Sequence, residues 1–484
     1  MTKNKPIPGQ QQVWIYLLGF LFLGVNLFLI SRDIYYLSVL PVLLIFIAAA
    51  FISLDKILLA VVFFTPLSVE LDEIIPDIAF NLFLPTEPLL VGIFFLFFFK
   101  LLLDGKIDRR ILTHPVTIVI YFYLFWMLLT SLTSTMPLVS LKYFLSRFWY
   151  IVGFYFIGIH LFAQKKNIIR FQWLYIIPLV LVAVYTIVRL SGYGLNDQRA
   201  SNFVVQPFFN DHTSYGAMLV FFFFPLLYLL FRKDNFLLRK TLTGLLTAFF
   251  IFAIVLSYTR AAWLSLFAAI GIFVVIRLRI KFRTLLITAG LLVGLFFAFQ
   301  NQIIWALEDN STESSGDLKE HIQSMANITS DASNLERINR WKCAIRMFEE
   351  KPFWGWGPGS YAFQYAPFQM SRDLTIISTN FGDLGNAHSE YLGPLSESGV
   401  LGMASMLALV VAFYLTAFKV YRRHQEKSLK NLILVLILSM SSYFIHGVLN
   451  NFLDTDKASV PFWAFIAMIV AIDIYYQPEE LQAS

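Results

Sequence analysis

Residues 218–231 read MLVFFFFPLLYLLF, a run that is apolar on every face of a helix or a strand. A strand of a membrane β-barrel would instead alternate apolar and polar residues. Similar runs of about 16–20 residues recur along the chain between short charged clusters, and about 20 residues of helix are enough to cross a bilayer. The sequence therefore predicts an all-α, polytopic integral membrane protein.

The composition of the chain supports this fold class. Hydrophobic residues make up 58% of the 484 residues and charged residues only 14%, against about 25% charged in soluble domains. The single cysteine, Cys343, excludes an intramolecular disulfide framework. The net charge of +6 does not indicate nucleic-acid binding, because Lys and Arg collect on the cytoplasmic side of membrane proteins.

We predict about 12–14 transmembrane helices. The candidate spans lie near residues 13–30, 37–53, 57–69, 88–103, 115–133, 148–163, 171–190, 213–231, 242–257, 261–277, 284–300, 399–418, 431–448 and 459–476. The third is short for a membrane span. The first lacks a small-residue cleavage site, so we expect a retained helix and not a signal peptide.

Basic residues predict which side of the membrane each loop occupies. With the N-terminus in the cytoplasm, most of the 37 Lys and Arg residues fall in cytoplasmic loops. This orientation places both termini inside and leaves one long external segment at residues 301–398. The expected organisation is therefore transmembrane helices over 1–300, a large external loop over 301–398, and further transmembrane helices over 399–484.

The external loop carries recognisable local signals. An amphipathic helix is predicted over about residues 334–350. Its expected apolar face consists of Leu335, Ile338, Trp341, Ile345 and Phe348. Pro352 is expected to end this helix. A tight turn follows, with glycine at 355, 357 and 359.

The segment 386–402, NAHSEYLGPLSESGVLG, closes the external loop where the chain enters the next predicted span. Its His388 stands beside two hydroxyls and a carboxylate. A histidine can be neutral near pH 7 and accept a proton from a hydroxyl, so His388 is a candidate general base. The alternative is an interfacial or helix-capping histidine that its neighbouring backbone satisfies.

Arginines on the same side are candidate anion ligands. Arg260 lies between two apolar spans almost without a loop, and a charge so close to hydrocarbon indicates function unless it only anchors the hairpin to lipid phosphates. Arg337 and Arg340 are three apart on the predicted loop helix and so share a side of it. A guanidinium suits pyrophosphate oxygens, although a solvated helix surface would also explain the pair. Arg199 and His212 are secondary candidates.

Together these signals resemble a known family. The order is Arg260, then Arg340-Trp341, then Gly-Trp-Gly-x-Gly-x-Tyr at 355–361, and finally His388-Ser389, nine residues, and Gly399-x-x-Gly402. This order is similar to the O-antigen ligase and polymerase superfamily of bacterial envelope glycosyltransferases. Phe209-Asn210-Asp211-His212 also resembles an asparagine motif of that family, which often has Pro where this chain has Asp211. The motifs cover residues 200–402.

The resemblance implies a GT-C-like, metal-independent, inverting glycosyltransferase of the bacterial inner membrane, with its active site on the periplasmic face and no cofactor. The donor would be a glycan on undecaprenyl pyrophosphate and the acceptor a lipid A core or another glycan. Arg260 and Arg340 would bind the pyrophosphate, and His388 would deprotonate the acceptor hydroxyl. The protein would otherwise contact membrane lipids.

Several activities remain open at this point. Ligation to lipid A core, which we favour, and polymerisation of repeat units both need the same pyrophosphate clamp and base. Transfer to a protein hydroxyl is a third activity of the same fold. A transporter is the rival class, but it would more often show inverted repeats and broken helices in corresponding halves, and neither is evident in this sequence.

Overall fold

A computed structural model describes residues 8–32, 37, 54–74, 82–104, 108–232, 236–281, 283–284, 332–375, 378–379 and 385–476. Within these ranges, ten helices are long and apolar enough to cross a membrane. They are α5 (Thr86–Asp104), α7 (Pro115–Leu132), the continuous α8 (Pro137–Ile151), η3 (Val152–Ile157) and α9 (Gly158–Phe162), α10 (Lys165–Tyr193), α12 (His212–Leu230), α13 (Leu237–Leu256), α14 (Arg260–Arg277), α19 (Leu392–Arg423), α20 (Lys427–Leu449) and α21 (Asp456–Tyr475). The predicted all-α polytopic fold is confirmed.

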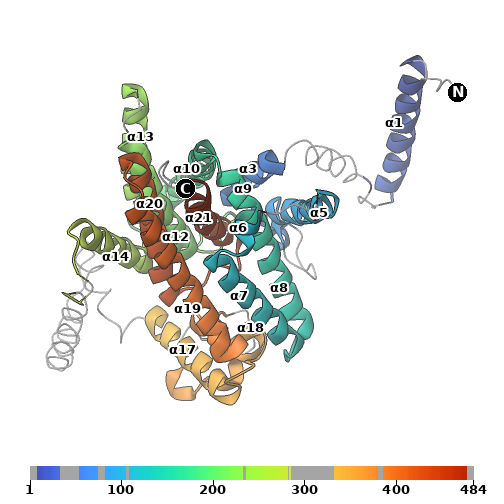
Figure 1. Ribbon diagram of the computed structural model, residues 1–484. Coiled ribbons are helices and arrows are strands. Elements are labelled where there is room, and N and C mark those ends of the chain that lie inside the picture. Colours follow the sequence, from blue (N-terminus) through green and yellow to red (C-terminus); the bar gives the residue numbers. More distant parts are fainter. Residues whose placement is uncertain are drawn as a thin grey trace.

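Ten of the predicted spans coincide with these ten helices. The span predicted at 13–30 lies in α1 (Pro8–Ile30), a helix of 23 residues that stands to one side of the bundle (Figure 1). Apart from their first residues, the spans at 37–53 and 284–300 lie outside the described residues, as does the stretch 301–331 of the external loop.

The span predicted at 57–69 is wrong. Its helix, α3 (Leu54–Phe64), has 11 residues, a length of about 16 Å against the roughly 30 Å of a bilayer core. It ends in the 3₁₀ turn η2 (Thr65–Leu67), which contains Pro66. The chain then forms a small antiparallel pair of strands, β1 (Val69–Glu70) and β2 (Phe83–Leu84), with α4 (Leu71–Ile74) between them.

The bundle is built around α21, whose residues are almost all buried. Helices α9, α19, α20 and α12 pack around it, and α12 in turn packs on α13, α14 and α20 (Figure 1). Stacked and edge-on aromatic rings fill the centre: the centroids of Tyr175 and Phe222 are 4.0 Å apart and those of Phe221 and Phe465 are 4.6 Å apart. Without a hydrophobic driving force in lipid, such close packing is what holds membrane helices together.

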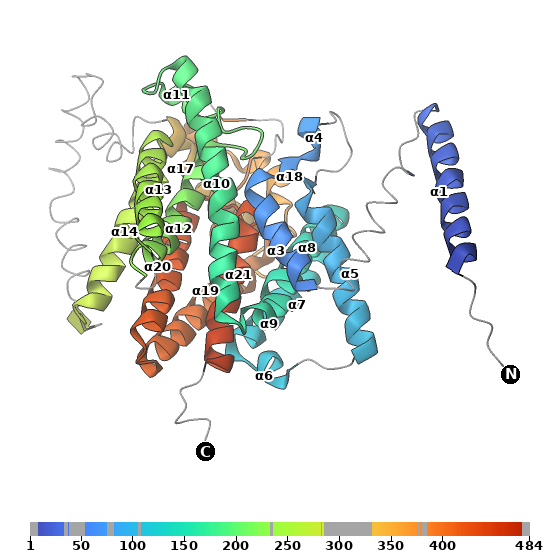
Figure 2. The ribbon, with the colours of Figure 1, turned by 90° about the horizontal axis from the view of Figure 1, so that it is seen from above.

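Helices of the external loop cover one end of the bundle. They are α17 (Ala332–Glu350), α18 (Tyr361–Gln364), η5 (Ala366–Phe368) and η6 (Ser371–Asp373). Helix α17 packs against α19, and α11 (Gln198–Ser201) lies at the same end (Figure 2). The opposite end carries α6 (Arg109–Leu112). We refer to these as the α17 end and the α6 end.

Helix α17 confirms the predicted amphipathic helix, but its buried face differs from the predicted one. Ile345, expected inside, is 42% exposed. The buried residues are Glu336, Asn339, Arg340, Cys343, Ala344 and Met347. The prediction failed because this helix buries an ion pair and an amide against the loop residues that follow it, and apolar periodicity cannot reveal a polar buried face.

Candidate active site

The segment 386–391 uses most of its polar groups to build structure. Glu390 Oε1 accepts hydrogen bonds from the Tyr443 hydroxyl and from the backbone amides of Phe452 and Leu453, at 2.7–2.9 Å. Ser389 Oγ accepts from the backbone amides at the start of α19, and the Tyr391 hydroxyl donates to the Phe444 carbonyl oxygen. These three side chains therefore fix the segment between α19 and α20.

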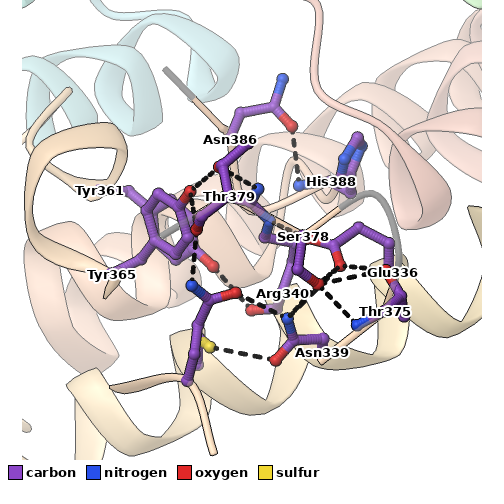
Figure 3. Close-up of polar contacts among 12 residues, drawn as sticks. Glu336, Asn339, Arg340, Tyr361, Tyr365, Thr375, Ser378, Thr379, Asn386 and His388 are labelled. Carbon is purple, nitrogen blue, oxygen red and sulfur yellow. Dashed lines mark hydrogen bonds and ion pairs between the residues drawn. The ribbon is translucent and has the colours of Figure 1, made fainter. Parts of the chain in front are cut away.

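His388 is the exception in this segment. Its backbone is left-handed, with φ of +47°, and is held by Asn386 Oδ1, which accepts from the His388 amide at 3.0 Å, and by Trp341 Nε1, which donates to the His388 carbonyl oxygen. Its imidazole has no hydrogen-bond partner among the described residues and points away from the Arg340 network (Figure 3). The ring is thus not used for structural bonds within the described residues.

Four chain segments converge around His388 at the α17 end. Thr259 Oγ1 donates to the His212 carbonyl oxygen at 2.7 Å, which joins the start of α14 to the start of α12. The Glu390 amide donates to the Gly447 carbonyl oxygen at 2.7 Å, which joins the His388 segment to the end of α20. Arg260, the first residue of α14, and His212, the first of α12, therefore lie next to each other in the fold.

Asp211 precedes α12, at the position where the resembled family often has proline. Its carboxylate caps α12 by accepting from the amides of Thr213 and Ser214, at 3.0 and 2.8 Å. Such a cap satisfies helix amides that would otherwise lack partners and places a negative charge at the positive end of the helix dipole. The neighbouring Asn210 Nδ2 donates to Glu70 Oε1 and so ties the β1 strand to the same place.

Arg340 lies inside the loop and holds it together (Figure 3). Its side chain is 5% exposed and its Nε donates to Glu336 Oε1 at 2.6 Å. The guanidinium also donates to Thr379 Oγ1 and lies over the Tyr365 ring, 3.9 Å from its centroid. Its Nη1 is buried without a hydrogen-bond partner among the described residues. Arg340 is thus a loop-organising residue with one donor group left unpaired within the described residues.

The other two arginine candidates, Arg337 and Arg199, differ in their burial and in their surroundings. Arg337 is half-buried, and its charge acts on His388, His212 and His446, which places it within the converging segments. Arg199 is exposed on α11, and no contact recorded for the described residues joins it to His388. The charges of Arg337 and Arg340 thus place both near His388, and the Thr259 bond places the start of α14, with Arg260, beside His212. Arg199 has no such link within the described residues.

Burial and positive charge set the protonation state of His388. The surrounding protein lowers its pKa to about 4 because it removes water from the imidazole, and the charges of Arg337 and Arg340 lower it further. The carboxylates of Asp211 and Glu336 act in the opposite direction. His388 is therefore neutral at pH 7, the state that accepts a proton. Within the described residues, no group of three His, Cys, Asp or Glu side chains is arranged to hold a metal ion.

Two polar cavities lie beside the His388 segment, and sequence reasoning missed most of their walls. The larger, about 170 Å³, is lined by Arg147, Glu397 and Asp454 as well as by Asn386 and Ser389. The smaller, about 110 Å³, lies on the side of Asp211 and Lys457. Asn386, Asn451 and Asp454 line both cavities. Arg147, a charged residue in the spanning helix α8, is the signal that would have pointed to this region.

The turn at 355–359 fixes the start of α19 next to these cavities. The amides of Trp356 and Gly357 donate to the carbonyl oxygens of Ser396 and Glu397, at 3.1 and 2.7 Å. In the opposite direction, the Val400 amide donates to the Pro352 carbonyl oxygen at 2.9 Å. The crossing occurs where α19 is broken at Gly399, with φ of +68° and ψ of −166°.

Residues 244–407 match the sequence profile of a family described as O-antigen ligase. The match covers about a third of the chain. The match runs from within α13 to within α19 and includes Arg260, Arg337, Arg340 and His388, so the resemblance seen in the sequence motifs is confirmed. No curated protein matches the chain.

Proposed function

We propose that this protein transfers a glycan from undecaprenyl pyrophosphate to an acceptor hydroxyl on the periplasmic face of the bacterial inner membrane, most simply to lipid A core. The observation that carries the proposal is His388: its ring is the one polar side chain of the 388–391 group left without a structural bond among the described residues, and the charges of Arg337 and Arg340 act on it at the end of a membrane bundle. The family match supports the reaction class.

In the proposed reaction, His388 and the arginines have different roles. The acceptor oxygen attacks the anomeric carbon from the face opposite the pyrophosphate and inverts it, while His388 takes the hydroxyl proton. The bond between that carbon and the phosphate oxygen breaks, and the lipid pyrophosphate leaves with the electron pair. Arg260 and Arg337 stabilise the charge on the leaving group without a metal. Arg340 adds its charge and its unpaired Nη1.

Binding of the donor should also activate the base. The charges of Arg337 and Arg340 lower the pKa of His388. A pyrophosphate beside these arginines neutralises them, so the pKa of His388 rises toward its ordinary value and the ring becomes a stronger base. This coupling favours proton removal only when the leaving group is in place.

The pH dependence of the reaction tests this coupling. Since Arg337 lowers the pKa of His388, Arg337→Gln should move the acidic limb of the kcat/KM profile to higher pH, in addition to lowering its plateau. The wild-type limb is expected below pH 6.5, the ordinary histidine value. Profiles from about pH 3 to about pH 8.5 would measure the acidic limb of both proteins. Arg372→Gln, at an exposed position of the same loop, is the control and should leave the limb in place.

The acceptor is tested with purified protein in a lipid bilayer. An undecaprenyl-pyrophosphate-linked glycan is supplied alone and then with a lipid A core acceptor, with and without EDTA, and products are analysed by gel and mass spectrometry. We expect product only when the core acceptor is present, and no effect of EDTA. Longer glycans from the donor alone would identify a repeat-unit polymerase instead. No transfer in either arm would contradict the proposal and favour protein glycosylation or transport.

The basic residues support the proposed orientation. The loops at the α6 end carry Arg109 and Arg110, Lys165 and Lys166, and Arg422 and Arg423, next to spanning helices. Short loops rich in Lys and Arg are retained in the cytoplasm. The α17 end, with His388, would then face the periplasm, where glycans on undecaprenyl pyrophosphate are exposed.

A further inference from the structure

The larger cavity beside the His388 segment has the composition of a sugar-binding site. Charged and amide groups line one part of its wall, namely Arg147, Asn386, Asn451 and Asp454. The aromatic side chains of Trp126, Tyr143 and Tyr361 line another part. A sugar ring offers both kinds of surface, with hydroxyls around its rim and C–H groups on its faces. A pocket with aromatic walls and a few oriented polar groups suits such a ligand.

Some polar groups in the cavity wall have no hydrogen-bond partner within the described residues. Asn451 Oδ1 is buried and has no hydrogen-bond partner in the described structure. Asn386 uses its Oδ1 for the His388 amide, and its nitrogen points away from that bond (Figure 3). Asp454 is exposed and has no ion pair within the described residues; its own backbone amide donates to its carboxylate, and the charges of Arg147 and Glu390 act on it. Buried polar groups without partners are costly, so an occupant that bonds to them would be favoured.

Asp454 is an exposed acidic residue shared by the walls of the two cavities. The crowded surroundings raise its pKa to about 6, chiefly because they remove water, and the Glu390 carboxylate adds to this effect. At pH 7 Asp454 is therefore mostly ionised and can accept hydrogen bonds from hydroxyl groups.

Other groups in the wall already have structural roles. Arg147 donates to the Leu453 carbonyl oxygen at 2.6 Å and to the Tyr143 hydroxyl at 2.7 Å. Glu397 accepts from the Tyr361 amide at 3.0 Å. These bonds hold the wall rigid, which lowers the entropic cost of binding a ligand. The cavity thus combines a fixed frame with a few unsatisfied groups.

We propose that this cavity binds one sugar residue of a substrate, with Asp454, Asn451 and Asn386 as its hydrogen-bonding residues. Asn386 lines the cavity and also accepts the hydrogen bond from the His388 amide. A sugar in the cavity would therefore contact the residue that positions His388. The inference rests on the proposed glycosyl transfer and names the subsite that this transfer would use. The sugar belongs either to the acceptor or to the donor glycan, and binding experiments separate the two.

The test measures binding without turnover, in His388→Asn protein in nanodiscs. One arm uses the oligosaccharide of the delipidated lipid A core, and the other uses the repeat-unit oligosaccharide released from its lipid carrier. Saturation-transfer NMR and calorimetry should detect binding of one of them. Asp454→Asn and Asn451→Leu should weaken it about tenfold or more, as the loss of a charged or buried hydrogen bond would. Asp197→Asn, which keeps a capping residue at α11 on the same end, is the matched control.

A second measurement does not depend on loss of binding. Ala362→Cys places a reactive thiol in the cavity wall at a position that the proposed hydrogen bonds do not use, and the oligosaccharide that binds should slow its alkylation. The native Cys343 gives little background, because it is fully buried and burial raises its pKa to about 11. Neither oligosaccharide binding, or binding that is insensitive to the cavity variants with no protection of the introduced thiol, would overturn the subsite. If wild-type protein nevertheless transfers glycan, the proposed function survives that result.

Discussion

Replacing His388 by asparagine should abolish glycan transfer while the protein remains folded in the membrane. Removal of a general base typically costs about 100- to 10,000-fold in rate. Asparagine is the sharper choice because His388 adopts φ of +47°. Asn tolerates this left-handed region, whereas alanine there would add about 1–2 kcal/mol of strain. His388→Ala should therefore lose activity equally and also lose some stability.

The measurement is the rate of transfer from the lipid-linked donor, with size-exclusion profile and thermal unfolding recorded on the same preparations. His160→Ala is the matched control, since His160 is exposed near the opposite, α6 end of the bundle. It should leave the rate unchanged. Transfer at a normal rate by the folded His388→Asn protein would remove the base assignment and with it the mechanism proposed for this site.

The spanning helices could be predicted from sequence because each is a continuous apolar run, and hydropathy alone identifies such runs. The failure at 57–69 has a local cause. Its apolar residues continue through Pro66 into a strand, so composition suggests a span where the backbone turns. Hydropathy measures transfer to lipid but does not say whether a segment of 11 helical residues is long enough to cross it.

The site was only partly predictable. His388 and Arg260 could be singled out as candidates because each is a polar residue next to an apolar run. The roles of Glu390 and Arg340 could not, since both depend on partners far away in sequence or on a buried helix face. Arg147 and Asp454 meet only through the packing of α8 against the loop after α20. No local pattern encodes such long-range polar contacts.

The cavities also show why the glycine motif belongs to the site. Gly399 breaks α19, and the residues just before the break, Glu397 and Ser398, line the larger cavity. Trp126 Nε1 donates to the Ser398 carbonyl oxygen at 2.8 Å, which ties the same turn to α7. The break therefore sets the direction of the helix start that carries the cavity wall and, through Ser389, the His388 segment.

Gly399→Ala should accordingly prevent the α17 end from folding correctly and should abolish transfer. The backbone angles at Gly399 belong to a region that only glycine occupies readily, and forcing another residue into it costs about 1–3 kcal/mol. In addition, a Cβ atom there would overlap the Phe353 carbonyl oxygen and lie 2.5 Å from its carbonyl carbon. Relief of this overlap would break the bond from the Val400 amide to Pro352.

The same substitution at Gly271, within α14, is the matched control. An added Cβ at Gly271 meets nothing within 4 Å, and alanine in a helix is favoured over glycine by about 1 kcal/mol. Gly271→Ala should therefore unfold at the same or a higher temperature and keep its activity. Thermal unfolding in nanodiscs, the yield of monodisperse protein and the transfer rate separate the two variants. A Gly399→Ala protein that matches the wild type in all three would mean that the turn at 352–359 does not need its crossing with α19 to hold the site.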